Sequence, residues 1–339
     1  MTRRRHIFPN KKSRNNFIAL ACALFGLCIY TMGIWSPVKH DTTFVINSGD
    51  SVSSVASALR KNHIVYSESL FKLAIRNMGG RVQRGDYDIP SGISIWRVAR
   101  MFANGWVATT DITIPEGLTI KQIKVLLVNT PRLSGDVECV SGNMAAVCDL
   151  HDGDIFPDTY RVAKGTPRLA VLDLARKKME SMRNSLLRAG YIIPRPLKNW
   201  NDVITLASIV QRETPRESEM PIVASVYINR LRKGMRLQAD PTVVYALTDG
   251  YGDMRGEPLL TGHLKIDSPY NTYTHNGLPP APIANVGAAA IRAVLRPADT
   301  NYLFFVADGQ GGHIFSKSYD EHMKHHADWR EIKNARNKK

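Results

Sequence analysis

Residues 201–215, with the sequence NDVITLASIVQRETP, predict an amphipathic helix that ends beside an acid. Its apolar residues recur at spacings of three and four along one face: Val203, Leu206, Ala207 and Val210. Proline cannot continue the backbone hydrogen-bond ladder, so Pro215 ends the helix. Glu213 therefore falls in the last turn, on the apolar side of the helix, where a carboxylate is out of place.

The position of Glu213 has chemical consequences. Partial burial and the unpaired carbonyls at a helix C-terminus both disfavour a negative charge, so we expect a raised pKa for this carboxyl group. An acid that keeps its proton near neutral pH can protonate the departing oxygen when a glycosidic bond is cleaved. The alternative, which the spacing alone favours, is an edge glutamate paired with Arg212, Arg216 or another base.

A second helix and three proline-rich loops follow. Pro221 suits the first turn of that helix and Gly234 its end. Residues 238–242, 268–273 and 277–283 are too rich in proline for regular helix or central strand, and they display side chains of the kind that bind sugars. The candidate substrate-binding residues are Asn229 in the second helix and, in the loops, Gln238, Asp240, Thr242, Tyr270, Asn271, Thr272 and Tyr273. The alternative is an ordinary long connection, although loops of this length are more often functional.

The C-terminal residues predict a strand hairpin and a helix. Residues 302–306 and 313–315 are strand-like and flank three glycines. His322, His325 and His326 are close in sequence, but no carboxylate or cysteine spacing around them matches a standard metal site. We therefore expect no metal and no cofactor, and we assign these histidines to a solvated helix face.

The N-terminal third carries a threefold repeat. Residues 44–59, 87–102 and 112–127 each contain an apolar strand, a glycine turn, a Ser or Thr cap and an apolar-faced helix. The offsets from the glycine are the same in all three copies. Residues 42 to 105 resemble the LysM-type glycan-binding module, which implies a surface for amino-sugar polymers. A spacer without a binding role is the alternative.

A segment of nineteen residues without charge, Phe17 to Trp35, precedes the repeats. As a helix it spans about 28 Å, close to the thickness of a bilayer's hydrocarbon core. Six basic residues and no acid occupy the first sixteen positions. The positive-inside rule then predicts a cytoplasmic tail at 1–16, a membrane helix at 17–37 and an exported remainder. A cleaved signal peptide is the alternative, but its apolar region is shorter and ends in an A-x-A site.

The formal net charge of +15 suits an anionic neighbour, namely a membrane surface, a wall polymer or nucleic acid. No zinc-type cysteine cluster, P-loop or RNA-binding signature accompanies the charge, so we expect no nucleic-acid partner. Cys139 and Cys148 lie nine positions apart in the expected exported part. They predict a disulfide in an oxidising compartment, with two unrelated thiols as the alternative.

Several blocks of this sequence resemble the endolytic murein transglycosylases of the YceG-like family. The blocks lie at 206–214, 223–231, 234–242, 270–273, 277–283, 302–308 and 312–315, with shorter matches at 115–119 and 156–160. The likeness runs from the membrane segment to His322. We therefore expect an α+β fold, with a LysM-like small α+β domain at 38–130 and a mixed α+β catalytic domain at 131–339.

The resemblance implies an inner-membrane enzyme whose catalytic domain lies in the periplasm and acts on peptidoglycan glycan strands. It implies cleavage within strands, between N-acetylmuramic acid and N-acetylglucosamine, which leaves 1,6-anhydro ends. Nascent peptidoglycan, whose elongation the cut terminates, is the implied substrate, and peptidoglycan synthases are the implied partners. The catalytic acid of the family is the second glutamate of an E-x-E-T stretch. That position is Glu213 here, and the first glutamate is replaced by Gln211.

The chemistry is consistent with a single acid. A hydrolase normally uses two carboxylates, one as the acid and one as the base or nucleophile. A lytic transglycosylase can use one residue, which first gives a proton to the leaving oxygen and then takes one from the sugar's own C6 hydroxyl. Asp240 and Glu219 are the nearby acids that we consider as assistants. A muramidase-type hydrolase and a non-catalytic glycan-binding scaffold remain the alternatives.

Overall fold

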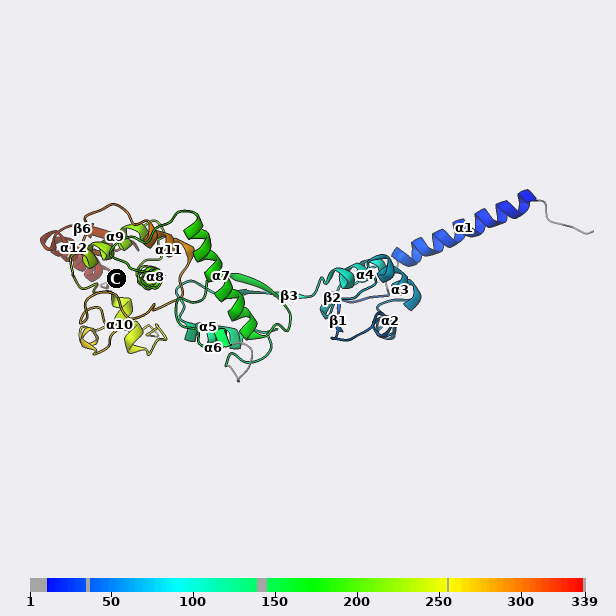
Figure 1. Cartoon of the computed structure of the whole chain (residues 1–339), viewed down its shortest axis with the longest axis horizontal. Coiled ribbons are helices and arrows are strands. Elements are labelled where there is room, and N and C mark those ends of the chain that lie inside the picture. Colours follow the sequence, from blue (N-terminus) through cyan, green and yellow to red (C-terminus); the bar gives the residue numbers. More distant parts are fainter. Residues whose placement is uncertain (1–10, 35–36, 139–144, 255, 338–339) are drawn as a thin grey trace, which may run out of the picture. The chain divides into compact units, whose positions relative to one another are not determined.

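The computed structural model describes residues 11–34, 37–138, 145–254 and 256–337 (Figure 1). Its contacts divide the chain into two compact units, residues 1–110 with 163–165 and residues 111–162 with 166–339. The first helix is α1 (Lys11–Ile34). Within the described residues, no helix is both long enough and apolar enough to cross a membrane. The membrane helix expected at 17–37 is thus not confirmed, and residues 1–10, 35 and 36 lie outside the described residues.

The first unit is built on two antiparallel strands, β1 (Thr42–Ile46) and β2 (Gly85–Ile89), in which Phe44 lies opposite Tyr87. Its core is shared by α2 (Val52–Lys61), α3 (Glu68–Asn77) and α4 (Ile95–Asn104). Phe102 of α4 is fully buried at the centre. Its ring lies 4.5 Å from that of Tyr87, 5.7 Å from that of Phe44 and 6.0 Å from that of Phe71, measured between centroids.

The predicted strand–turn–helix pattern is present three times. Its glycine turns have φ values that residues with a Cβ rarely adopt: Gly49 (92°), Gly92 (73°) and Gly117 (80°). Hydroxyl side chains cap the helices that follow: Ser51, Ser94 and Thr119. The third copy, β3 (Thr109–Thr113) with α5 (Ile120–Asn129), joins the core of the second unit through Ile112, Ile123 and Leu127. The contacts accordingly divide the units at residue 110. The domain boundary expected at 130 stays a prediction.

The second unit is a mixed α+β structure, as predicted. Strand β3 pairs with β4 (Thr159–Ala163), and α6 (Ala145–Cys148) and α7 (Arg168–Arg188) pack beside each other. Helix α8 (Trp200–Glu213) contacts α9 (Met220–Arg232), α10 (Asp240–Leu247) and α11 (Ala288–Leu295). A 3-10 turn at His263–Lys265 follows α10. The antiparallel hairpin of β5 (Phe304–Ala307) and β6 (His313–Ser316) then leads into α12 (Tyr319–Asn337).

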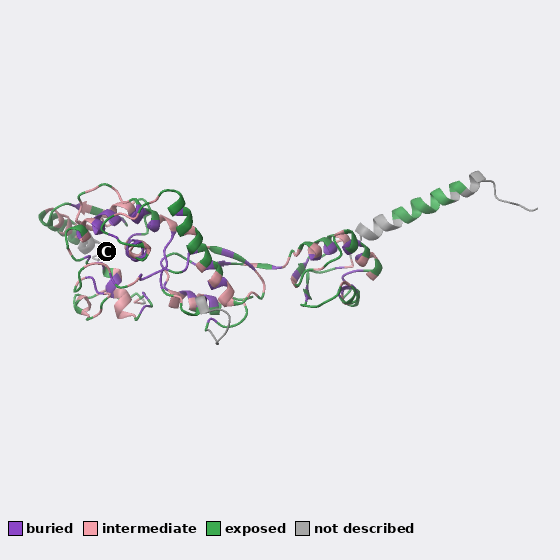
Figure 2. Ribbon diagram, viewed as in Figure 1, coloured by how far each residue is buried: buried purple, intermediate pink, exposed green. Residues whose placement is uncertain are grey.

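Helix α8 is buried on all sides rather than on one face. Every residue from 203 to 210 is buried, and Figure 2 shows buried residues of the whole chain in purple. The predicted amphipathic pattern is wrong here, because the positions between the apolar ones hold small or apolar residues that the neighbouring helices cover. Ser208 meets its hydrogen-bonding needs internally, since its Oγ donates to Thr205 O at 2.7 Å and accepts from Ile283 N–H at 3.0 Å.

A buried amide joins three distant segments of the second unit. Asn285 is 0% exposed, and its Oδ1 accepts hydrogen bonds from the N–H groups of Gly153 (3.0 Å) and Ile155 (3.1 Å). Its Nδ2 donates to Leu118 O at 3.1 Å. Gly117 N–H also donates to the carbonyl of Asn285 at 2.8 Å. These bonds tie the turn before α5 and the loop before β4 to the segment that leads into α11.

One loop prediction needs correction. Residues 238–242 are not a loop throughout, because α10 begins at Asp240 with Pro241 in its first turn. The N–H that proline lacks is unpaired at that position of a helix in any case, so the residue fits there. Residues 268–273 and 277–283 form neither helix nor strand, as predicted.

The cysteines are only partly described. Cys22 is a free thiol, and Cys148 takes part in a disulfide bond. Cys139 lies outside the described residues. Its pairing with Cys148 therefore stays a prediction.

Candidate active site

Helix α8 carries Glu213 to the edge of the buried core. Its N-cap is Asn199, whose side chain accepts a hydrogen bond from Asp202 N–H at 2.9 Å. The helix ends at Glu213, as predicted, because Thr214 adopts an extended conformation (φ −136°, ψ 131°) before Pro215. The last helical residue thus leaves the core and is half-buried as a whole.

The carboxyl group of Glu213 holds its proton more tightly than an ordinary glutamate. Burial first, and the negative charge of Asp240 second, raise its pKa from 4.5 to about 7. Two neighbours oppose this rise, namely a hydrogen bond from Tyr227 and the positive charge of Arg230. Tyr227 donates its hydroxyl hydrogen to Glu213 Oε2 at 3.1 Å. The raised pKa predicted from the sequence is confirmed.

The two arginines near Glu213 have other partners. Arg212 donates to the backbone carbonyls of Gly117 and Gly252. Arg216 donates to Glu219 Oε1 at 3.3 Å and to Gln310 O at 2.6 Å. The alternative drawn from the sequence, an ion pair between Glu213 and one of these bases, is not what the structure contains.

Asp240 and Tyr273 form a second polar group beside Glu213. Tyr273 donates its hydroxyl hydrogen to Asp240 Oδ1 at 2.6 Å. Burial, together with the charges of Asp240 and Glu213, raises the pKa of Tyr273, so the phenol remains a donor at neutral pH. Both residues were predicted as substrate-binding, and the structure brings them to the carboxyl group that the sequence singles out.

Arg230 supplies the positive charge near this group. Its side chain is buried, at 8% exposed, and stacks over the ring of Phe304 at 5.3 Å. Its Nε donates to Leu303 O at 2.6 Å and its Nη1 to Leu237 O at 2.7 Å. These bonds to fixed carbonyls hold the guanidinium in place, so its charge acts on Glu213 from a constant position.

Three predicted binding residues are buried beneath the site and do not line its surface. Thr242 and Asn271 are 0% exposed and Thr272 is 1% exposed, so a glycan cannot contact them in this structure. Thr272 Oγ1 accepts from Ala239 N–H at 3.0 Å and lies 2.9 Å from Thr242 Oγ1. Asn271 Nδ2 donates to two carbonyls of the preceding turn, and its Oδ1 accepts from Tyr273 N–H at 2.9 Å. The three residues therefore fix the positions of the two segments that carry Asp240 and Tyr273.

The other two polar candidates differ from each other. Asn229 donates its Nδ2 to the carbonyls of Thr300 (2.8 Å) and Tyr302 (3.1 Å), which gives it a structural role. Gln238 is exposed, and its positive φ of 50° turns the chain just before Asp240. Because few non-glycine residues adopt such a φ, we retain Gln238 as a candidate.

Tyr270 lines a pocket of about 380 Å³ together with Tyr245. The two rings lie 4.8 Å apart between centroids. Tyr245 donates its hydroxyl hydrogen to Asp152 Oδ2 at 2.7 Å, and Asp152 is buried. A pocket walled by aromatic rings with a few fixed polar groups suits a sugar.

Sequence reasoning misses Tyr227 and Arg230 as members of the site. Tyr227 is buried in α9, and the sequence gives no partner for its hydroxyl group. A usable signal is the spacing, because a phenol and a guanidinium three residues apart share one face of the largely apolar α9. Polar groups buried on such a face need partners, and here these are Glu213 and fixed backbone carbonyls.

Gln211, which stands where the family resemblance implies a glutamate, has two partners. Its Oε1 accepts a hydrogen bond from Gly287 N–H at 3.1 Å, and its side chain also bonds to Glu116. Burial raises the pKa of Glu116, and the bond from Gln211 opposes this rise. The amide thus links α8 to the turn before α5 and to the start of α11.

The histidines of α12 pack against the β5–β6 hairpin and do not form a solvated face. All three are half-buried, and two of them contact Phe304 and Ser316 of the hairpin. His322 stacks on the ring of Phe304 at 5.2 Å, and His325 Nδ1 lies 2.9 Å from Ser316 Oγ. Among the described residues, no group of three or more His, Cys, Asp or Glu side chains is arranged to hold a metal ion.

Known proteins resemble this chain along most of its length. The model of the YceG-like family matches residues 44–328. A Bacillus subtilis (strain 168) protein named endolytic murein transglycosylase is 28% identical over 326 residues, which span 88% of this chain and 89% of the relative. A Streptococcus pneumoniae (strain D39) protein of the same name is 22% identical over 320 residues, which span 84% of this chain and 57% of that longer relative.

A solved structure shares the fold. It is the crystal structure of a YceG-like protein from Listeria monocytogenes, with 27% sequence identity and a TM-score of 0.51. The match covers 84% of this chain and 98% of that chain.

Proposed function

The chain belongs to the YceG-like family, and on this premise we propose that it is a lytic transglycosylase that cuts within peptidoglycan glycan strands. The observation that carries the proposal is Glu213, a half-buried acid at a helix end with a pKa raised to about 7. The names of the relatives from Bacillus subtilis and Streptococcus pneumoniae support the same reaction class, that of a lyase acting on murein.

Glu213 serves as both acid and base in this reaction. Its protonated form donates to the glycosidic oxygen of N-acetylglucosamine while the bond from that oxygen to C1 of N-acetylmuramic acid breaks. The resulting carboxylate accepts the proton of the C6 hydroxyl of the same N-acetylmuramic acid, whose oxygen bonds to C1. The strand then ends in a 1,6-anhydro sugar, Glu213 has recovered its proton, and no water is consumed.

The charges around Glu213 suit the two halves of this cycle. The negative charge of Asp240 favours the protonated acid before cleavage, and it stabilises positive charge that develops at C1 as the bond breaks. Tyr227 and Arg230 favour the carboxylate, which is the form needed to accept the second proton. A pKa of about 7 keeps both forms accessible near neutral pH.

Incubation of the purified full-length protein with glycan strands tests the proposal, with mass spectrometry of the products. New 1,6-anhydro ends support it. New reducing ends would instead indicate a muramidase-type hydrolase, and unchanged strands would indicate a glycan-binding scaffold. A pull-down on wall strands with the Glu213→Gln variant then separates binding from cleavage, because the tyrosines near the site are unaltered.

The proposal extends to the cellular setting. We place residues 1–16 in the cytoplasm, a single anchor in the inner membrane and the catalytic unit in the periplasm. This placement is supported by the uncharged run from Phe17 to Trp35 behind six basic residues. The first unit acts as a LysM-like glycan-binding module, a role supported by its two capped strand–turn–helix segments. The substrate is nascent peptidoglycan, whose elongation the cut terminates, and peptidoglycan synthases are the partners that supply it.

Reporter fusions test the topology. A reporter that works only in the periplasm and is fused after Lys339 should be active, and the mature protein should retain its first residues. Activity of a reporter that works only in the cytoplasm would reverse the orientation, and a mature N-terminus near residue 38 would remove the anchor.

A further inference from the structure

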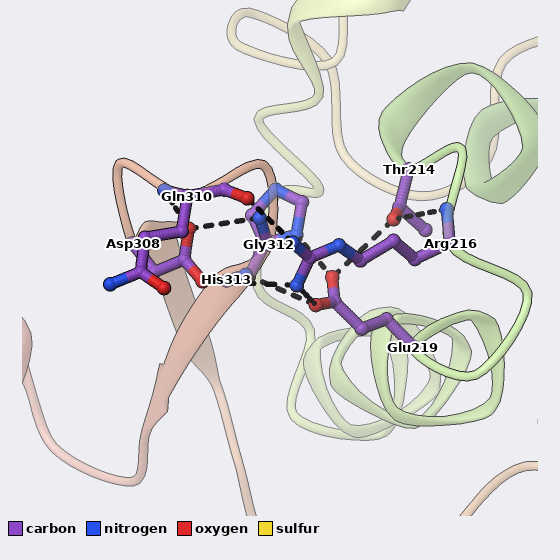
Figure 3. Close-up of polar contacts among 7 residues, drawn as sticks. All are labelled: Thr214, Arg216, Glu219, Asp308, Gln310, Gly312 and His313. Carbon is purple, nitrogen blue, oxygen red and sulfur yellow. Dashed lines mark hydrogen bonds and ion pairs between the residues drawn. The ribbon is translucent and has the colours of Figure 1, made fainter.

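A second cluster of charged residues lies directly after the proposed acid. Glu219 closes the turn between α8 and α9, and His313 begins β6. Figure 3 shows the turn and the hairpin loop facing each other, with the Glu219 carboxylate between them. Oε2 of Glu219 lies 2.8 Å from His313 Nδ1, and Oε1 accepts from His313 N–H at 3.3 Å. We call this pair of residues the clasp.

The clasp is reinforced from both sides. Arg216 reaches Glu219 Oε1 at 3.3 Å and also donates to Gln310 O at 2.6 Å, so one guanidinium bridges the turn and the hairpin loop. Asp308 lies 3.9 Å from Arg216 and shapes the loop by accepting from Gly312 N–H at 2.9 Å. Two segments that lie 94 positions apart in sequence are thereby held together. The side chains of Glu219 and His313, which join them, are each only 14% exposed.

Glu219 carries the negative charge of the clasp. Burial would raise the pKa of Glu219, but the hydrogen bonds from His313 and the charges of His313 and Arg216 outweigh burial and hold the pKa below its usual value. The Glu219 charge therefore persists through the pH range in which Glu213 titrates.

Two chains of contacts run from the clasp to Glu213. The first follows the backbone: Thr214 is fully buried, donates its hydroxyl to Glu219 Oε2 at 3.4 Å, and directly follows Glu213. The second passes through aromatic rings. The ring of His313 meets Phe305 edge-on at 5.1 Å, Phe305 meets Tyr227 edge-on at 5.9 Å, and Tyr227 donates to Glu213.

We propose that Glu219 and His313 are positioning residues, which fix the carboxyl group of Glu213 and its hydrogen bond from Tyr227 by locking the end of α8 to the β5–β6 hairpin. The last turn of a helix frays unless tertiary contacts hold it, and the residue that follows α8 has its side chain tied to the clasp. A shift of about 1 Å in a catalytic group costs on the order of 10²-fold in rate. This inference rests on the proposed function of Glu213.

Glycine at position 312 provides an independent probe. A Cβ added there would overlap the terminal atoms of Arg216 and Glu219. Those atoms are the ends of flexible side chains, so Gly312→Ala should displace the clasp without unfolding the hairpin. Gly312→Ala changes no charge. It therefore disturbs the clasp by steric overlap alone, whereas Glu219→Ala removes the carboxylate.

The experiment compares five single variants and one double variant in the full-length protein. The single variants are Glu219→Ala, Glu219→Gln, His313→Ala, Gly312→Ala and Glu217→Ala, and the double variant is Glu219→Ala/His313→Ala. Glu219→Ala should lower kcat by about 10–100-fold while KM stays within about twofold, because substrate contacts are unaltered. His313→Ala and Gly312→Ala should act in the same direction, and the Glu219→Ala/His313→Ala double variant should be no worse than either single change. Glu219→Gln retains an acceptor for His313 and should restore kcat to within about tenfold of wild type. Exposed Glu217 is the matched control and should behave as wild type.

The titration of Glu213 separates positioning from simple stability. When the clasp is broken, the hydrogen bond from Tyr227 weakens, so the pKa of Glu213 should rise, as followed by ¹³C NMR of labelled glutamate and by the pH profile of kcat. The inference is overturned if Glu219→Ala keeps wild-type kcat, or if its loss follows a lower Tm while Glu213 titrates unchanged. The NMR measurement needs no turnover. If the wild-type protein forms no anhydro ends, the proposed function is refuted. The NMR titration would still show whether the clasp positions Glu213.

Discussion

Replacing Glu213 by glutamine should abolish turnover. The same change should stabilise the fold, but only at pH values above the pKa of the Glu213 carboxyl group. Glutamine keeps the shape and can still accept the hydrogen bond from Tyr227, while it removes the transferable proton and the charge. Loss of a general acid–base group costs about 10²–10⁴ in rate, and more where no other group substitutes.

The magnitude of the stability effect follows from the pKa. Folding raises the pKa of Glu213 from 4.5 to about 7, which corresponds to a cost of about 3 kcal/mol for ionising it in the folded state. Because the group is half-buried and partly screened by solvent, we reduce this to about 1–2 kcal/mol. The folded chain binds the proton more tightly than the unfolded chain, so this cost appears as pH rises through the interval from 4.5 to about 7.

Thermal unfolding at two pH values is the assay. At pH 8 the Glu213→Gln variant should melt about 2–8 °C above wild type, and at pH 4 the two should melt together. An equal difference at both pH values would mean that shape, not charge, separates the proteins. A lower melting temperature at pH 8 would refute the burial argument, and near wild-type cleavage by the variant would remove Glu213 as the acid.

Three further outcomes are expected. Asp240→Asn removes a negative charge beside Glu213 and should lower its pKa, so the fall of activity with rising pH should begin at lower pH; an unmoved pH profile would contradict the coupling. Gln211→Glu should keep activity within about tenfold, since an added charge there should change the pKa of Glu213 by no more than about one unit; a loss of several orders of magnitude would reveal a positioning role for the amide. Thiol labelling of the native protein without reductant should leave Cys139 and Cys148 unreacted, and their free reaction would exclude the predicted bridge, whose contribution we put at about 2–3 kcal/mol.

The placement of Glu213 was predictable because it depends on local rules. Proline at 215 ends the helix, the preceding residues are apolar, and the acid must then lie at the boundary of the core. The same rules failed to predict α10. Proline indicates a break in a helix unless it lies in the first turn, and the sequence does not show where that turn begins. Local pattern also could not show that α8 is covered on every side, since that depends on three other helices.

The neighbours of Glu213 were predictable only in part, because tertiary packing brings them together. Asp240 reaches the acid through the docking of α10, which depends on the buried hydroxyls of Thr242 and Thr272. Tyr227 reaches it through the packing of α9 against α8. The candidate residues had been chosen for their chemistry alone. Some of them, such as Tyr273, lie near the acid, whereas others, such as Asn271, form hydrogen bonds that hold the loop.

The buried amide of Asn285 has a consequence for the order in which the protein folds during synthesis. The apolar core of the first unit lies entirely within residues 38–102, so it can close soon after this segment leaves the ribosome. The second unit must wait, because Gly153 and Leu118 find their partner only 132 and 167 residues later in the chain. Nascent chains stalled before residue 285 should accordingly show a protease-resistant first unit followed by a digestible remainder, and chains extended past α11 should become resistant throughout the second unit.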